Sequence, residues 1–226
     1  MKKKFLALAL SLTMVLGLAA CGGGSDNASS DGSSAASGDS GSSTVVVAMG
    51  SGFSTLDPGY VYEKYPPMIV NACYETLFKF YSNDGAPEPC LADTYEFSED
   101  GLTLTVTLKD GITFASGNPM TSADVAFSIN RCKNLQGNPA FIADTIDSIE
   151  TPDEKTIVFH LNQQDSAILS KLTYSSLSVL DSAVVKENGG TDAEDAATTD
   201  TAQSYLDTTS AGSGMYVMTS YTPDEE

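Results

Sequence analysis

The chain has 226 residues, a formal net charge of −19 and a hydrophobic fraction of 41%. This length and hydrophobic content suit one ordinary folded domain with an appendage, and they exclude a chain that is disordered throughout. Thirty acidic residues against eleven basic ones argue against nucleic-acid binding, which needs a basic surface to displace phosphate counterions. The same excess disfavours adsorption to an anionic membrane surface, apart from attachment through a lipid.

The first twenty residues have the pattern of a secretory signal. Three lysines precede an apolar stretch over residues 5–18, which is shorter than a typical transmembrane helix. The quartet Leu-Ala-Ala-Cys that ends at Cys21 matches the bacterial lipobox, in which the cysteine is lipidated and becomes the mature N-terminus. We therefore expect a signal peptide at residues 1–20 and an extracytoplasmic protein that is lipid-anchored to the bacterial cell membrane through Cys21. The alternative is a plain signal peptide that happens to end near a cysteine.

Residues 22–43 are expected to form a tether behind the anchor. Nine Ser and six Gly fill these twenty-two positions together with Ala, Asp and one Asn. A segment of this composition cannot bury a core, so the sequence predicts a flexible coil with a reach of about 25 Å. The lipidated cysteine and the tether thus occupy residues 21–43.

The first half of the folded part mixes helix and strand patterns. A β-branched run at residues 44–49 predicts a buried strand. Prolines at positions 66 and 67 predict the start of a helix, whose apolar spacing extends to about Phe80. Residues 102–108 alternate apolar residues with threonine after the turn Ser98-Glu99-Asp100-Gly101, and this pattern predicts a β-hairpin.

The second half opens on a strong helix signal. Thr121 followed by Asp124 is a capping-box pattern, which predicts a helix with an apolar stripe of Val125, Ile129 and Cys132. The further predicted elements are a hairpin of 146–150 with 156–161, a short helix at 165–172, a strand near 177–180, a helix capped by Asp181 that runs through 186, a helical turn around 202–206 and a strand at 215–221.

Three cysteines follow Cys21, and their number is odd. At most one intramolecular disulfide can form among Cys73, Cys90 and Cys132, and Cys73 to Cys90 is the conceivable pair in an exported protein. The alternative is that they are small buried hydrophobic residues with free thiols. Their spacing resembles no metal site.

The sequence offers no set of catalytic residues. The lone His160 lies in a predicted strand, out of phase with Ile157, Phe159 and Leu161, and is therefore expected to face away from the apolar side. No Gly-x-Ser-x-Gly nucleophile elbow, HExxH, CxxC or Walker loop is present. We expect a protein that is not an enzyme and that uses no cofactor and no metal.

Five segments in the folded part match, in order, the motifs of one protein family. The segment at 100–114 is similar to the family segment DGLTYTFHLRKGVKFHDG, and the segment at 117–128 is similar to GTPLTAEDVVFS. The shorter matches are Leu56-Asp57-Pro58, Pro89-Cys90-Leu91-Ala92-Asp93 and Gly212-Ser213-Gly214-Met215-Tyr216. On these segments the chain resembles the family 5 solute-binding proteins, which are the dipeptide, oligopeptide and nickel receptors of ABC importers.

The resemblance implies an α/β fold of the periplasmic-binding-protein type, the type II two-lobed clamp that binds its solute between the lobes. It implies that residues 44–62 start lobe I, that residues 63–180 form a small hairpin-rich subdomain, and that residues 181–226 return to lobe I. Because family members are considerably longer, we expect a truncated N-terminal fragment that holds only the N-terminal lobe and subdomain portion. The alternative is a complete small protein.

The resemblance also implies a function, which is that of a substrate-binding lipoprotein of an ABC importer. Such a protein captures peptides or a related small solute outside the membrane and delivers them to permease subunits. A monomer is expected, and no nucleic acid is a partner. By position, Gly52, Phe53 and Ser54 fall in the loop that contributes ligand contacts in peptide-binding relatives. The solute class stays open among dipeptide, oligopeptide, nickel complex and oligosaccharide. Two alternatives remain, a lipid-anchored surface hydrolase and an inert surface spacer or adhesin.

Overall fold

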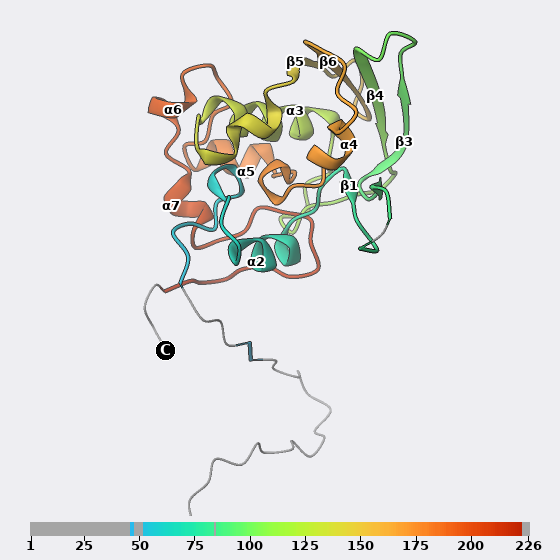
Figure 1. Cartoon of the computed structure of the whole chain (residues 1–226). Coiled ribbons are helices and arrows are strands. Elements are labelled where there is room, and N and C mark those ends of the chain that lie inside the picture. The colour runs from blue at the N-terminus through green and yellow to red at the C-terminus, as the bar shows by residue number, and fades with distance from the viewer. Residues whose placement is uncertain (1–45, 48–51, 84, 223–226) are drawn as a thin grey trace, which may run out of the picture. The chain divides into compact units, whose positions relative to one another are not determined.

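Two β-hairpins and the helix between them form the centre of the fold (Figure 1). The computed structural model describes residues 46–47, 52–83 and 85–222, so the predicted signal peptide, Cys21 and tether lie outside the described residues. The chain divides into the units Met1–Val46 and Val47–Glu226, and every element named below belongs to the second unit. Among the described residues, no helix has the length and apolar character needed to cross a membrane.

The central sheet has four antiparallel strands in the order β3-β4-β6-β5. The strands are β3 (Ala92–Phe97), β4 (Thr103–Leu108), β5 (Ile146–Glu150) and β6 (Thr156–Leu161). Leu104 lies opposite Phe159 and Val106 lies opposite Ile157, so the apolar residues of the alternating pattern share one buried face. In the β3–β4 turn, Gly101 adopts a φ of 67°, a backbone conformation that residues with a Cβ rarely take. Both predicted hairpins are confirmed.

Helix α3 (Ser122–Asn134) covers the buried face of this sheet and begins where the capping box predicts. The carboxylate of Asp124 accepts hydrogen bonds from the Thr121 N–H and from the Thr121 hydroxyl, both at 2.8 Å. Val125, Ile129 and Cys132 are buried among the apolar residues of the sheet. The predicted helix start and the predicted apolar stripe are therefore confirmed.

The helix predicted from residue 66 to about residue 80 is too long. Helix α2 spans Pro66–Cys73, and Tyr74 is already extended, with φ −130° and ψ 160°. The following residues form β1 (Phe78–Lys79), which pairs with β2 (Glu88–Pro89). The carbonyl of Leu77 accepts the N–H groups of Cys90 at 2.9 Å and Ala92 at 3.2 Å. This pairing with a later segment replaces the helical hydrogen bonds that the local apolar spacing favours.

The remaining elements are three 3₁₀ helices, η1 (Pro58–Tyr60), η2 (Asn138–Ala143) and η3 (Ser175–Leu177), and four short helices, α4 (Ile168–Lys171), α5 (Ser182–Glu187), α6 (Ala196–Thr199) and α7 (Gln203–Leu206).

A second apolar cluster joins α2 to the C-terminal part of the described chain. Val70 of α2, Val185 of α5 and Leu206 of α7 are buried together in this cluster. The Asp181 carboxylate accepts the N–H groups of residues 183 and 184, which confirms the predicted cap of α5.

Two of the predicted C-terminal strands are absent from the described residues. The segment 177–180 is buried, but η3 ends at Leu177, and Val179 donates a single bond to the Glu75 carbonyl at 2.9 Å. The segment 215–222 is irregular, and Met215 keeps 90% of its surface exposed. Both segments have β-forming composition, but neither lies in register beside a strand that would complete a ladder.

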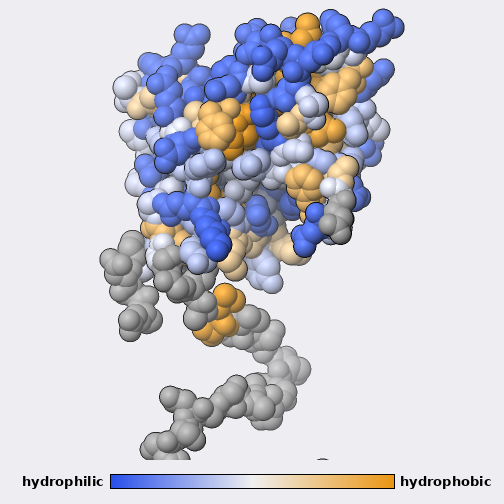
Figure 2. All heavy atoms as spheres, viewed as in Figure 1, coloured by the Kyte–Doolittle hydropathy of each residue, from blue (hydrophilic) through white to orange (hydrophobic). Residues whose placement is uncertain are grey.

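The strand predicted at residues 44–49 falls mostly outside the described residues. Its two described members, Val46 and Val47, belong to no strand and are 88% and 64% exposed. Figure 2 shows the surface from the side seen in Figure 1, where separate hydrophobic patches interrupt a mainly hydrophilic face. Several exposed aromatic side chains gather in one region of the molecule, which is described next.

Candidate functional site

The three residues expected to contact a ligand lie in an open segment ahead of η1. Gly52 and Ser54 are exposed, and Phe53 is half-buried. The Phe53 ring lies 5.6 Å from the ring of Tyr221, and the Ser54 hydroxyl donates a hydrogen bond to the Glu63 carboxylate. The segment therefore touches two surfaces, one at the C-terminal end of the described chain and one at the start of α2.

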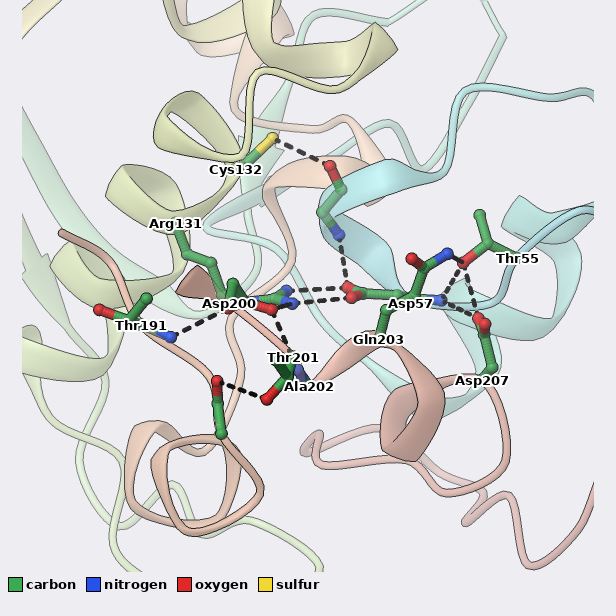
Figure 3. A network of polar contacts seen from close by, with 12 residues as sticks. Thr55, Asp57, Arg131, Cys132, Thr191, Asp200, Thr201, Ala202, Gln203 and Asp207 are labelled. Carbon is green, nitrogen blue, oxygen red and sulfur yellow. Dashed lines mark hydrogen bonds and ion pairs between the residues drawn. The ribbon is translucent and has the colours of Figure 1, made fainter. Parts of the chain in front are cut away.

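The Leu56-Asp57-Pro58 segment fixes this open segment to the body of the protein (Figure 3). One oxygen of Asp207 accepts three donors, the Thr55 hydroxyl at 2.6 Å, the Leu56 N–H at 2.7 Å and the Asp57 N–H at 3.2 Å. The Asp57 side chain in turn accepts the N–H of Gly59 at 3.0 Å at the start of η1. The carboxylates of Asp207 and Asp57 thus hold the backbone of residues 55–59 in place next to the open segment.

A pocket with aromatic walls lies between the start of α2 and the segment before η3. Its volume is about 380 Å³, and we call it the aromatic pocket. It is lined by Val61, Tyr62, Glu63, Lys64, Pro67, Tyr174 and Ser175. Tyr62 and Tyr174 are 51% and 50% exposed, and the Tyr62 ring meets the ring of Phe141 edge to face at 5.4 Å and 82°. Large rings held half-exposed in one place are typical of a binding surface.

The chemistry of the aromatic pocket suits a solute with both apolar and charged groups. Its rings offer apolar contact, the Tyr62 and Tyr174 hydroxyls can donate or accept hydrogen bonds, and Glu63 and Lys64 supply one charge of each sign. A carboxylate and an ammonium on adjacent residues match the two ends of a zwitterion such as a short peptide. Ser54, through its bond to Glu63, stands at the edge of this pocket.

A second pocket of about 330 Å³, which we call the apolar pocket, lies between α2 and the C-terminal segment. Its lining consists of Val47, Leu56, Met68, Ile69, Ala72, Cys73, Tyr216, Met218, Ser220 and Tyr221. Phe53 adjoins it through its contact with Tyr221. This pocket holds no charged side chain, so it offers a zwitterionic solute nothing for its charges. Of the two pockets, the aromatic pocket is the better candidate for solute binding.

His160 lies on the face of β6 that turns away from the buried side, as the sequence predicts. Its Nε2 is 3.2 Å from an oxygen of Glu150, and its side chain is 37% exposed. The pair lies on the outer face of the sheet, where neither residue lines the aromatic or the apolar pocket. Within the described ranges, no group of three His, Cys, Asp or Glu side chains is arranged to hold a metal ion.

Cys73, Cys90 and Cys132 are all buried and free of disulfides. Burial raises the pKa of the Cys132 thiol to about 12, and burial also raises the pKa of Cys73. Because the thiolate is the reactive form, alkylation of Cys132 in the folded chain is expected to be slower than in the unfolded chain, by about a thousandfold from the pKa shift alone. Peptide mapping after iodoacetamide treatment at pH 8, with and without urea, measures this ratio. Equal labelling of Cys132 under both conditions would contradict its burial.

A family comparison decides what this architecture belongs to. Residues 86–226 match the model of the bacterial extracellular solute-binding proteins, family 5, over the middle region of that family. The chain is a family 5 solute-binding protein. The match covers β2 and all later elements, including the two hairpins, α3 and the residues that line one side of the aromatic pocket.

Curated family 5 relatives agree with this assignment. A probable D,D-dipeptide-binding periplasmic protein of Escherichia coli is 29% identical over 182 residues, which cover 78% of this chain and 33% of the relative. A glutathione-binding protein of Pectobacterium atrosepticum is 30% identical over 146 residues, which cover 64% of this chain and 28% of the relative. The matched part of the chain thus spans about a third of the length of these relatives.

Solved structures confirm the α/β fold of the type II periplasmic binding proteins. The ABC transporter substrate-binding protein CtaP from Listeria monocytogenes aligns with a TM-score of 0.60 at 25% identity, over 76% of this chain and 33% of that one. NikZ from Campylobacter jejuni, solved in complex with Ni(L-His), aligns with a TM-score of 0.61 at 20% identity, over 76% and 32% of the two chains. Family 5 members are extracytoplasmic proteins that bind solutes, and the relatives carry solute-binding rather than enzymatic names.

The family 5 motifs led to Gly52, Phe53 and Ser54, but sequence reasoning missed the aromatic pocket. Its two lining rings, Tyr62 and Tyr174, lie far apart in the chain, and Phe141, which contacts Tyr62, lies in η2. The only local signal was the density of aromatic and charged residues around residues 60–65. Of the three sequence-predicted residues, the structure brings Ser54 to the rim of the aromatic pocket and Phe53 to the apolar pocket, and it leaves Gly52 in the open.

Proposed function

We propose that this chain is part of a lipid-anchored receptor of an ABC importer and that it captures a peptide-type solute for delivery to the permease. The membership in family 5 over residues 86–226 carries this proposal. Curated relatives are named for dipeptide and glutathione binding, which are both peptide-type ligands. A monomeric receptor that docks on ABC permease subunits is the proposed assembly, on the strength of the same membership.

The aromatic pocket is the proposed solute wall on this chain. Its rings would pack against the apolar parts of a peptide, while Glu63 and Lys64 would face the amino and carboxylate ends. Ser54 supports the proposed role of the Gly52-Phe53-Ser54 segment, because its hydroxyl holds the Glu63 carboxylate at the pocket rim. The proposed lobe boundaries at residues 62 and 180 place both ends of this wall near a junction between subdomains, where ligand sites commonly lie.

Peptide binding by this chain is expected to be weak, with a dissociation constant in the millimolar range, about −4 kcal/mol. The reason is that Tyr62 and Tyr174 leave half of their surface to solvent, so one wall covers only one side of a ligand. Titration of the chain with D-Ala-D-Ala, glutathione and tri-alanine, followed by NMR chemical shifts, measures the affinity and the position of binding. A micromolar constant would contradict a one-sided site.

Matched variants locate the binding site. Tyr174→Ala is expected to weaken the shift changes at Tyr62, because it removes one ring of the pocket. Tyr216→Ala, in the apolar pocket, serves as the control and is expected to leave them unchanged. Shift changes centred on Phe53 and Tyr221 would place the solute at the apolar pocket and overturn the assignment.

The anchor makes a separate prediction. The lipobox ending at Cys21 and the Ser/Gly segment behind it support lipidation of this cysteine. Cys21→Ala is therefore expected to abolish lipid attachment, so that the chain accumulates as precursor or leaves the membrane fraction. Fractionation of cells with metabolic labelling by a fatty acid measures both effects. Unchanged processing and unchanged membrane association of the variant would contradict the lipid anchor.

A further inference from the structure

A buried ion triad joins three distant parts of the chain (Figure 3). Arg131 donates from Nη1 and Nη2 to the two oxygens of Asp57, each at 2.8 Å. It also donates from Nε and Nη2 to the two oxygens of Asp200, at 2.8 and 2.9 Å. The side-chain exposures of Arg131, Asp57 and Asp200 are 0%, 0% and 1%. None of the three lines either pocket.

Two members of this triad lie on the chain segments that lead to the exposed aromatic pair. Asp57 precedes η1, which leads within a few residues to Tyr62. Arg131 lies in the last turn of α3, which leads through η2 to Phe141. The bidentate contact between Asp57 and Arg131 therefore ties together the two chain segments on which the rings are mounted. A guanidinium that meets a carboxylate through two parallel bonds permits one orientation, so the tie fixes direction as well as distance.

The two segments also meet without free space between them. A Cβ placed on Gly59 would lie 2.7 Å from Leu135 Cδ1 and 3.0 Å from Arg131 Nη1. A Cβ placed on Gly137 would lie 2.7 Å from Cδ1 of Tyr60. The side chains between η1 and the end of α3 are therefore closely packed, and the Asp57–Arg131 pair ties the same two segments together. Tyr62 follows η1, Phe141 lies in η2, and their exposed rings meet edge to face at 5.4 Å.

Burial of three charges adds little stability, because desolvation offsets the attraction between them, but a bidentate Arg–carboxylate pair constrains the orientation of the groups that it joins. We propose that the Arg131–Asp57–Asp200 triad is a positioning device that sets the Tyr62–Phe141 pair for solute contact at the edge of the aromatic pocket. This inference rests on the proposed function for the role of the pair, although the positioning itself is independent of any ligand. The members of the triad act through the backbone and touch no solute.

The test compares Arg131→Lys and Gly59→Ala with a control that weakens the fold elsewhere. Lysine keeps the charge but offers a single point donor, so it cannot hold both carboxylates bidentately. Alanine at position 59 keeps the triad residues but places a Cβ 2.7 Å from Leu135 Cδ1 and 3.0 Å from Arg131 Nη1, so the side chains at this contact, that of Arg131 included, must shift. Ile157→Ala, in the buried face of the sheet, is the control, because it lowers stability away from the triad. Urea midpoints show how much stability each of the three variants has lost. If Arg131→Lys does not fold, Gly59→Ala still tests whether the triad positions the Tyr62–Phe141 pair.

Two readouts are taken on each folded variant. The first is the nuclear Overhauser effect between the ring protons of Tyr62 and Phe141 without ligand, and the second is the affinity for tri-alanine. Both test variants are expected to lose most of the ring-to-ring signal and to bind tri-alanine about fivefold more weakly, which is the effect of one displaced aromatic contact. Ile157→Ala is expected to keep the signal and the affinity. A ring-to-ring signal retained in the test variants, or lost equally in the control, would overturn the positioning role. Loss of the signal with unchanged affinity would overturn the role of the Tyr62–Phe141 pair in solute contact. If the unaltered chain shows no affinity for any peptide-type probe, the proposed function fails, and the ring-to-ring signal still decides the positioning.

Discussion

Replacement of Arg131 by methionine is expected to destabilise the protein by about 3–5 kcal/mol, because it leaves the buried carboxylates of Asp57 and Asp200 without a counter-charge. Burial by itself lowers the pKa of Arg131, but its hydrogen bonds to the two aspartates raise that pKa above its ordinary value, so the guanidinium stays charged in the fold. Methionine fills a similar apolar volume, which confines the effect to the lost charge and hydrogen bonds. Urea denaturation followed by circular dichroism measures the change in the free energy of unfolding.

Two further variants show whether the loss comes from the orphaned carboxylates. The triple variant Arg131→Met, Asp57→Asn, Asp200→Asn removes all three charges and is expected to recover much of the lost stability, since neutral amides are less costly to bury. Lys155→Met removes the cation of the exposed pair with Asp110 and is expected to have a far smaller effect. A loss for Arg131→Met no larger than that for Lys155→Met would contradict the triad's burial in the folded protein.

Asp124→Ala is expected to destabilise the protein by about 3 kcal/mol, because both carboxylate oxygens are used as acceptors. One oxygen accepts the Thr121 N–H and hydroxyl at the start of α3. The other oxygen accepts the Ser182 N–H at 3.1 Å and the Ser182 hydroxyl at 2.6 Å at the start of α5. Asp124 is only 7% exposed, so water cannot fully replace these contacts when the carboxylate is removed.

The same denaturation measurement on Asp93→Ala provides the control for this second prediction, because Asp93 is an exposed carboxylate on β3. The loss of stability in Asp124→Asn is expected to lie between those of Asp124→Ala and Asp93→Ala. The amide oxygen of asparagine replaces one acceptor, but its NH₂ group faces donors and cannot accept hydrogen bonds from them. Native-state hydrogen exchange adds a local readout, in which the first amides of α5 lose protection in Asp124→Ala. A variant with the stability of Asp93→Ala and unchanged exchange in α5 would contradict the bridging role of Asp124.

The sequence by itself determined the elements whose signals are local. The two hairpins, the start of α3 at Ser122 and the cap of α5 by Asp181 agree with the structure because each depends on neighbouring residues. An alternating strand beside an Asp-Gly turn can bury its apolar residues in only one register. A capping box satisfies the free N–H groups at a helix start within three residues. The first hairpin and the start of α3 also carry family 5 motifs, so the family could be identified from these segments as well.

Only the tertiary structure decided the features that depend on distant partners. Helix α2 ends at Cys73 because the residues after it pair with the segment at 88–92, although the local spacing favours a longer helix. The segment 215–221 has strand composition but finds no neighbouring strand among the described residues. The Arg131–Asp57–Asp200 triad joins positions that are 74 and 69 residues apart, and a lone Arg or Asp in the sequence gives no sign of its partner. Contacts of this kind form only when the chain has closed long loops, and their residues therefore carry no periodic pattern that a sequence alone reveals.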